Sequence, residues 1–332
     1  MKKAIFILTL IAFTACTAVG LLASEKQEVD KVRIGISKIV SHPALDAAEQ
    51  GIQDELAALG YDAEFDLQNA NGEASTAASI ANKFKNEKVD IAVGIATPTA
   101  QALVNAMDEI IVVYTLVTDP VGAGLVDSFD RGGPNVTGIS DMTPVREQIM
   151  MLDRIRKLNS LGHVYSSSEA NAVILADMAR KACEDLGIEF VETTVTNSAE
   201  VKQATQTIVK RVDGIYVSTD NTVVSALSAL TEVAVENGVP VMSADPSSAE
   251  QFDVLAAWGF DYYKMGRATG KLIAELLEGA DPANIPTRFM TEPSDIDLLI
   301  NLDVADKLGL AIPQDILDNA SKVVENGELK QQ

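Results

Sequence analysis

The sequence has little cysteine and little histidine. Its 332 residues include two cysteines, Cys16 and Cys183, and two histidines, His42 and His163. Cys16 lies in a segment that we expect to be cleaved or lipidated, so no internal disulfide can form even in a compartment that permits one. Cys183 falls within the helical pattern ADMARKACEDLG and is predicted to be a small core residue.

Patterns typical of catalysis are also missing. His163 begins a predicted strand and is interpreted as structural, and no nucleophile with an orienting acid accompanies His42 at a recognisable spacing. The VGAG run at 121–124 lacks the third glycine and the strand–turn–helix setting of a dinucleotide site, and no metal-ligand cluster occurs. We therefore expect a protein that is not an enzyme and that uses no metal and no other cofactor.

Basic residues are scarce. The chain has 26 Lys and Arg against 48 Asp and Glu, which gives a formal net charge of −22 at pH 7. No basic patch stands out along the sequence. Because such a charge keeps a protein soluble and repels nucleic acid and anionic membranes, we exclude nucleic-acid binding.

The first 23 residues, MKKAIFILTLIAFTACTAVGLLA, differ from the rest. A positive start is followed by an apolar run and small residues, which predicts a secretory signal peptide and an exported, periplasmic or extracytoplasmic protein. Cleavage near Ala23 would remove two lysines and leave 24 basic against 48 acidic residues, a charge of −24. A membrane anchor is the alternative. Lipid anchoring through Cys16 also stays open, although Phe13 fits a lipobox poorly.

From residue 32 on, short β-rich runs alternate with longer helical patterns. Strands are predicted at 32–37, 61–67, 90–95, 110–116, 162–166, 188–195, 214–218 and 240–244, with helices at 44–60, 73–87, 99–107, 147–158, 171–187, 199–211 and 222–238. This alternation predicts an α/β fold with parallel sheets covered on both faces. Two halves, roughly 30–142 and 143–258, imply two lobes of similar build. The later helix at 267–279, the strand at 296–301 and the helix at 303–309 must join these lobes, so the chain is expected to cross between them more than once.

Polar residues follow the predicted strands in both halves. They are Ser37, Ser41, His42, Pro43, Thr97, Pro98, Thr99, Thr118, Asp119 and Pro120, then Ser166, Ser167, Ser168, Ser218, Thr219, Asp220, Asn221, Ser243, Asp245 and Pro246. Any one of them is most simply a helix cap. Ligands of open α/β sheets, however, bind outside the carboxyl ends of the strands. If the lobes face each other, the two sets line one cleft.

A long motif resembles a known family. LVTDPVGAGLVDSFDRGGPNVTGIS (116–140) is similar to the ABC-transporter substrate-binding proteins, in the group of the tryptophan- and phenylalanine-type binding proteins with the periplasmic-binding type I fold. Weaker matches are STDN at 218–221, GFDY at 259–262 leading to Gly266, and LGLAIP at 308–313. The resemblance covers about residues 32–325.

The resemblance implies two Rossmann-like lobes joined by a three-segment hinge. The N-lobe would be 30–142 plus about 262–284, and the C-lobe would be 143–258 plus about 291–325. Hinge segments are expected near 139–143, 258–262 and 284–291, with Gly138, Ser140, Gly259 and Asp261 as hinge residues. Residues 116–134 would follow the rim of the cleft, where glycines permit tight turns and close approach of the backbone.

The resemblance also implies a function. An exported, monomeric protein would capture a small molecule, with an aromatic amino acid favoured, and deliver it to a membrane permease. A nucleoside or sugar as ligand, or a sensor that reports to a membrane receptor, are the alternatives. The acidic charge disfavours phosphorylated ligands.

Roles can be assigned to the candidate ligand residues. Thr97 and Thr99 at a helix start would hold a carboxylate, and Asp220, with Asp141 or Asp245, would accept from an ammonium group. Asp220 and Asp245 can instead be simple helix caps, and this alternative is weaker for Asp220. The full set is Ser41, His42, Pro43, Leu45, Thr97, Pro98, Thr99, Thr118, Asp119, Ser140, Asp141, Ser166, Ser167, Ser168, Asn171, Asp220, Asn221 and Asp245, in which His42, Pro43 and Leu45 would contact the ligand side chain.

Overall fold

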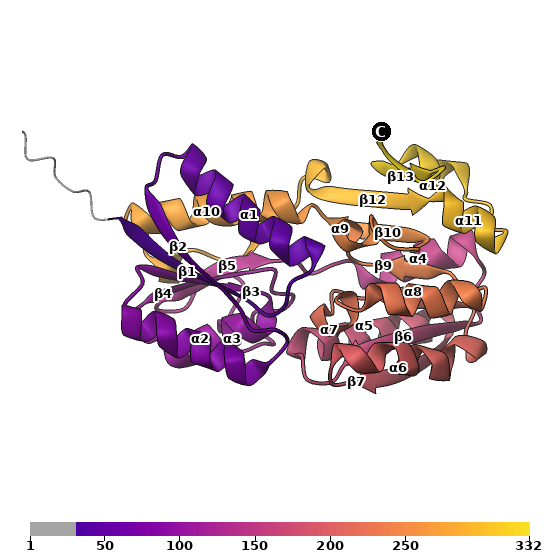
Figure 1. Cartoon of the computed structure of the whole chain (residues 1–332), viewed down its shortest axis with the longest axis horizontal. Coiled ribbons are helices and arrows are strands. Elements are labelled where there is room, and N and C mark those ends of the chain that lie inside the picture. Colours follow the sequence, from indigo (N-terminus) through magenta and orange to yellow (C-terminus); the bar gives the residue numbers. More distant parts are fainter. Residues whose placement is uncertain (1–30) are drawn as a thin grey trace, which may run out of the picture. The chain divides into compact units, whose positions relative to one another are not determined.

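The computed structural model describes residues 31–332. The predicted signal peptide and Cys16 lie outside the described residues. Two β-sheets organise the described part of the chain, and Figure 1 shows helices on both faces of each.

The first sheet is parallel throughout. Its six strands have the order β11-β5-β4-β3-β1-β2, and all pairings are parallel. The strands are β1 (Val32–Lys38), β2 (Ala63–Asn69), β3 (Ile91–Ile95), β4 (Ile111–Thr115), β5 (Val136–Ser140) and β11 (Arg288–Phe289). β3 and β5 are buried along their whole length, as expected for parallel strands that are covered on both faces.

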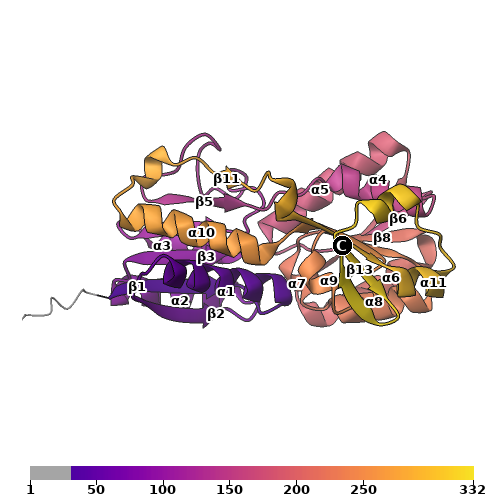
Figure 2. The ribbon, with the colours of Figure 1, turned by 90° about the horizontal axis from the view of Figure 1, so that it is seen from above.

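Four helices cover the first sheet. They are α1 (Pro43–Ala58), α2 (Ala74–Glu87), α3 (Thr97–Ala106) and α10 (Tyr262–Leu277). Figures 1 and 2 place α1 beside α10 on one face of the sheet, and α2 and α3 on the other. The backbones of α1 and α10 approach closely, because a Cβ on Gly266 would lie 2.2 Å from the carbonyl oxygen of Ala48.

The second sheet is mixed. Its eight strands have the order β14-β13-β12-β10-β9-β8-β6-β7. They are β6 (Ser160–Ser166), β7 (Glu189–Val195), β8 (Gly214–Val217), β9 (Val241–Ser243), β10 (Ala256–Phe260), β12 (Ile296–Asn301), β13 (Lys322–Glu325) and β14 (Glu328–Gln331). β12 runs antiparallel to β10, and β13 and β14 form an antiparallel hairpin. The predicted α/β fold is confirmed, but this sheet is mixed and not parallel throughout. The chain enters β12 directly from β11 of the first sheet, so no βαβ crossover within the second sheet fixes the direction of β12.

The helices around the second sheet include two short ones at strand ends. They are α4 (Val145–Ile155), α5 (Ala170–Leu186), α6 (Val201–Ile208), α7 (Asn221–Val224), α8 (Leu227–Glu236), α9 (Pro246–Ala249), α11 (Leu302–Leu308) and α12 (Gln314–Asp318). The single helix predicted over 222–238 is broken between α7 and α8. At the break, the Ser225 hydroxyl donates to the carbonyl of Thr222, a local bond that competes with a continuing helix.

The chain passes between the sheets three times. It does so after β5, after β10 and after β11. The first two passages coincide with the segments expected near 139–143 and 258–262, and the third, at 290–295, overlaps the end of the segment expected at 284–291. A hinge role for Gly138, Ser140, Gly259 and Asp261 stays a prediction.

Gly138 is required by close packing. It lies opposite Tyr114 in the β4–β5 pair, and a Cβ on it would stand 2.0 Å from the Tyr114 carbonyl oxygen. The Tyr114 ring is fully buried, with its hydroxyl 2.7 Å from Thr287 Oγ1. In the preceding loop the glycine with a left-handed backbone is Gly124, with φ 73°.

Candidate functional site

A cavity lies where strands of both sheets end, with about 310 Å³ of space that includes open solvent. Its lining residues are His42, Ala44, Leu45, Leu116, Asp141, Asn171, Thr219, Asp220, Asn221, Val224, Asp245 and Tyr262. His42, Leu116 and Asp141 follow β1, β4 and β5 of the first sheet, and the residues at 171, 219–221, 245 and 262 follow β6, β8, β9 and β10 of the second. The N-terminal ends of α1, α7 and α9 can be followed to this region in Figure 1.

Seven of the predicted ligand residues line this cavity. They are His42, Leu45, Asp141, Asn171, Asp220, Asn221 and Asp245. Pro98 and Ser168 line a neighbouring groove of about 950 Å³, in which Asn221 also takes part. The other nine line neither space; they are Ser41, Pro43, Thr97, Thr99, Thr118, Asp119, Ser140, Ser166 and Ser167.

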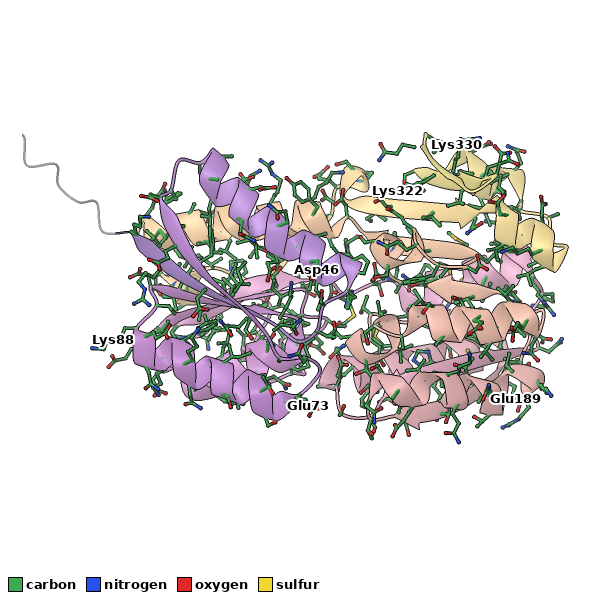
Figure 3. The ribbon with its side chains drawn as sticks, viewed as in Figure 1. Asp46, Glu73, Lys88, Glu189, Lys322 and Lys330 are labelled. Atoms are coloured by element: carbon green, nitrogen blue, oxygen red, sulfur yellow. The ribbon has the colours of Figure 1, made fainter. Side chains whose placement is uncertain are left out.

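Local hydrogen bonds explain why several of the predicted residues do not line the cavity. The Thr99 hydroxyl donates to the Ile95 carbonyl at 2.7 Å and is fully buried. The Ser41 hydroxyl donates to Asp46, which is labelled in Figure 3, at 2.6 Å. Thr97 is buried without lining either space. The carboxylate contact expected from Thr97 and Thr99 is therefore not supported, because the start of α3 does not reach the cavity.

Other predicted residues hold the lining in place. The Thr118 hydroxyl donates to Asp141 Oδ1 at 3.2 Å, and the Ser140 hydroxyl donates to the carbonyl of Thr118 at 2.8 Å. The Ser166 backbone N–H donates to Asp220 Oδ2 at 2.5 Å. These residues orient the cavity wall and do not face the cavity.

Asp220 and Asp245 both cap short helices, but they differ in whether Oδ2 has a hydrogen-bond partner. Asp220 accepts from Val223 N–H with Oδ1 and from Ser166 N–H with Oδ2. Asp245 accepts from Ser248 N–H with Oδ1 at 3.1 Å, but its buried Oδ2 has no hydrogen-bond partner among the described residues. Both aspartates are thus helix caps. The sequence favoured Asp220 over Asp245 as the partner of an ammonium group, whereas in the structure Asp245 has the free acceptor oxygen.

Further buried polar atoms of the lining have no hydrogen-bond partner in the described chain. They are both ring nitrogens of His42 and Oδ1 of Asn171. His42 is 8%, Asn171 3% and Asp245 2% exposed, and His42 Nδ1 lies 4.0 Å from Asp245 Oδ2. Buried polar groups are normally hydrogen-bonded. These atoms therefore have the features of a site that is completed by a ligand or by water.

Burial dominates the electrostatics of the cavity. It raises the pKa of Asp141 to about 7, against the opposing hydrogen bond from Thr118. It also raises the pKa of Asp220 to about 8, and the charge of Glu169 adds to this rise. Burial lowers the pKa of His42, although the charge of Asp245 opposes it. No lysine or arginine is among the described residues that line the cavity, so a positively charged ligand group would find only favourable partners.

The comparison with known families decides what kind of site this is. Residues 33–324 match the family model described as ABC transporter substrate binding protein. The chain belongs to this family. It is a substrate-binding protein of an ABC transporter, and proteins of this kind bind a small molecule and deliver it to a membrane permease.

Relatives of this substrate-binding protein cover most of its length. A protein from Clostridioides difficile (strain R20291) named tyrosine-binding protein is 36% identical over 296 residues, which is 87% of this chain and 85% of the relative. A Streptococcus pneumoniae structure described as an ABC domain in complex with L-Trp is 32% identical, with a TM-score of 0.84 over 89% of this chain and 100% of that one. A ligand-free, open substrate-binding protein from Clostridium difficile is 34% identical, with a TM-score of 0.66 over 88% of this chain and 99% of that one.

Four lining residues of this substrate-binding protein were not predicted, and they are Ala44, Leu116, Val224 and Tyr262. Thr219 was placed among the polar residues at the strand ends but not in the set of ligand residues. Tyr262 stands two residues beyond β10, within the GFDY motif, so its position gave a usable signal. Leu116 reaches the cavity through a left-handed backbone with φ 56°, which the sequence of a non-glycine residue does not announce.

Residues 31–332 contain neither a membrane-spanning helix nor a metal-binding cluster. None of the helices described there is long and apolar enough to cross a membrane. In the same residues, no group of three or more His, Cys, Asp or Glu side chains is placed to hold a metal ion.

Proposed function

We propose that this substrate-binding protein captures an aromatic L-amino acid in the cavity described above. The observation that carries the proposal is the free Oδ2 of Asp245, buried beside Asp141 in a cavity that also has an apolar wall. A buried carboxylate without a partner is costly unless a ligand or water completes it. The relatives named for tyrosine and crystallised with L-Trp support the same ligand class.

Each part of such a ligand has a counterpart in the cavity. The ammonium group would donate to Asp245, with Asp141 as a second acceptor. The neutral imidazole of His42 carries one N–H and would donate to the ligand carboxylate. The ligand ring would pack against Leu45 and Tyr262, which are almost completely buried.

Binding without catalysis is part of the proposal, and the binding proteins among the relatives support it.

We further propose that the two lobes close over the ligand through the three passages between the sheets. The backbone of this chain is more similar to the complex with L-Trp than to the open, ligand-free relative, with TM-scores of 0.84 and 0.66 at comparable sequence identity. Capture outside the cytoplasm, before delivery to the permease, fits the predicted signal peptide.

Calorimetry tests the ligand class, and X-ray scattering on the same samples tests closure. L-tyrosine, L-tryptophan and L-phenylalanine are titrated into the protein, with uridine, myo-inositol and O-phospho-L-tyrosine as comparison ligands. We expect heat and a smaller radius of gyration with at least one aromatic amino acid, and neither with the comparison ligands. Absence of binding by all three amino acids contradicts the amino-acid assignment, and binding of uridine or myo-inositol would support the alternative ligand classes.

A further inference from the structure

Glu169 is a buried carboxylate next to the cavity that the sequence analysis did not single out. It is 5% exposed, precedes α5, and lines the neighbouring groove but not the cavity. Its side chain makes no capping bond to its own helix. A buried charge of this kind needs several donors, and its donors come from residues near the cavity.

Four hydrogen bonds converge on Glu169. Oε1 accepts from the backbone N–H of Thr222 at 2.9 Å and from its hydroxyl at 2.7 Å. Oε2 accepts from Nδ2 of Asn221 at 2.5 Å and from Nδ2 of Asn171 at 3.5 Å. Glu169 thus connects α5 with α7 and contacts two amides that line the cavity.

These bonds determine which atom of each amide is available to a ligand. Nδ2 of Asn171 also donates to the carbonyl of Thr219 at 2.9 Å, so both of its neighbours are acceptors. A rotated amide would bring Oδ1 against two oxygens, and this fixes the orientation. Oδ1 of Asn171 is therefore the free atom, buried and without a partner in the described chain. Nδ2 of Asn221 likewise donates to Glu169, so the oxygen of this amide is the atom that lies away from Glu169.

We propose that Glu169 is a positioning residue that makes the site selective for an ammonium group, by turning the oxygens of Asn171 and Asn221 toward the ligand. With these two oxygens and Asp245 Oδ2, the polar wall formed by the second lobe presents acceptors. An ammonium group supplies three donors, whereas the same carboxylic acid without its amino group supplies none there. The inference rests on the proposed amino-acid ligand.

The test compares two ligands that differ only in the amino group. Affinities of L-tyrosine and 3-(4-hydroxyphenyl)propanoate are measured by calorimetry for the wild type and for Glu169→Gln. When the glutamine oxygen accepts from Thr222, its NH₂ group faces Nδ2 of Asn221, and this amide must then rotate and present a donor to the cavity. Asn171 loses its second acceptor, although its Nδ2 can still donate to the carbonyl of Thr219. We expect the preference for L-tyrosine to fall about tenfold or more, the effect of exchanging one or two hydrogen bonds to a charged group.

Two further variants make the result decisive. Glu192→Gln is the matched control, because Glu192 lies on β7, is paired with Arg180 and does not line the cavity. This variant should prefer L-tyrosine over 3-(4-hydroxyphenyl)propanoate as strongly as the wild type does. Asn171→Leu removes the acceptor directly and should lower the preference even if Glu169→Gln fails to fold. A folded Glu169→Gln or Asn171→Leu protein that keeps the wild-type preference overturns the inference. A wild type that binds no aromatic amino acid overturns the proposed function as well, so the two failures are distinguishable.

Discussion

Asp220 and Asp245 occupy equivalent positions at the starts of two short helices, α7 and α9. Each follows a strand of the second sheet, is almost fully buried and accepts a backbone N–H three residues ahead. Ser166 occupies the second oxygen of Asp220, whereas no described residue occupies that of Asp245. A carboxylate that is already satisfied gains less from a ligand than one with a free oxygen. The geometry therefore favours Asp245 as the partner of the ligand ammonium group.

Exchanging each aspartate for asparagine tests this difference. Asn remains a good helix cap, so Asp245→Asn should fold, but it places an NH₂ group or a neutral oxygen where the ammonium group donates. We expect its affinity for the amino acid to fall roughly ten- to a hundredfold, equivalent to ~1.5–3 kcal/mol. Asp220→Asn should change affinity less, because the raised pKa of Asp220 leaves that carboxyl largely uncharged near neutral pH. Calorimetry decides the order, and an equal or larger loss for Asp220→Asn contradicts the assignment.

Polar residues at strand ends could be placed in the cavity from the sequence, but their individual roles could not. His42, Asp220 and Asp245 were found because parallel strands bring their carboxyl ends to one edge. Thr99 has the same kind of position, yet its hydroxyl donates to the carbonyl of Ile95 at the end of β3. Which hydroxyl or carboxylate oxygen remains free depends on local hydrogen bonds, and these are not encoded in spacing.

The strands and helices also differ in how well the sequence predicts them. The long, periodic segments α1 and α5 match the predicted helices closely, because each has an apolar face at helical spacing. α10 begins at Tyr262, five residues before the predicted start. β11 and the β13–β14 hairpin were not predicted. β11 has two residues, and all four residues of β14 are exposed, so neither has an apolar pattern that marks a strand.

Gly138 offers a test of the packing between β4 and β5. A methyl group there would stand 2.0 Å from the Tyr114 carbonyl oxygen and 2.4 Å from its ring, and neither can move without disturbing a buried strand pair. We expect Gly138→Ala to lower the free energy of unfolding by about 3 kcal/mol, the upper part of the usual range for overpacking. Gly133→Ala is the control, because its methyl group would meet Val136 at an ordinary 3.6 Å. Urea unfolding of both variants measures the difference, and equal stabilities contradict the close-packing role.

The two sheets together create an acidic cavity in an acidic protein. Three aspartates line it, and the described lining has no lysine or arginine to balance them. Burial raises the pKa of Asp141 to about 7 and that of Asp220 to about 8, so the folded protein holds protons that the unfolded chain has already released. Stability must therefore depend on pH in a window set by these groups.

Two histidines with lowered pKa values also make stability depend on pH. Burial lowers the pKa of His42, and it lowers that of His163 to about 4. Between about pH 4 and 6.5 the unfolded chain binds more protons at these histidines than the folded protein, so their contribution makes stability rise with pH. Over the same pH range the two aspartates have the opposite effect, because they make stability fall as the pH rises. Above about pH 7.5 the histidines are largely neutral in both states. Between pH 6.5 and 7.5 the remaining protonation of the unfolded histidines offsets only part of the effect of the aspartates.

The protein without added ligand should therefore become less stable between pH 6.5 and 8. In this interval the folded state binds more protons than the unfolded state, so the free energy of unfolding falls by up to ~1.4 kcal/mol per pH unit for each aspartate that is still protonated. The combined decrease should be on the order of 2 kcal/mol, since Asp141 stops contributing near pH 7. Urea unfolding at pH 6.5 and 8.0 measures it, and the double variant Asp141→Asn, Asp220→Asn should lose most of the decrease because neither amide titrates. A wild type whose stability is constant across this interval, or a double variant with the same decrease, would show that these carboxyls are ionised in the folded protein and that the cavity holds them as charged groups.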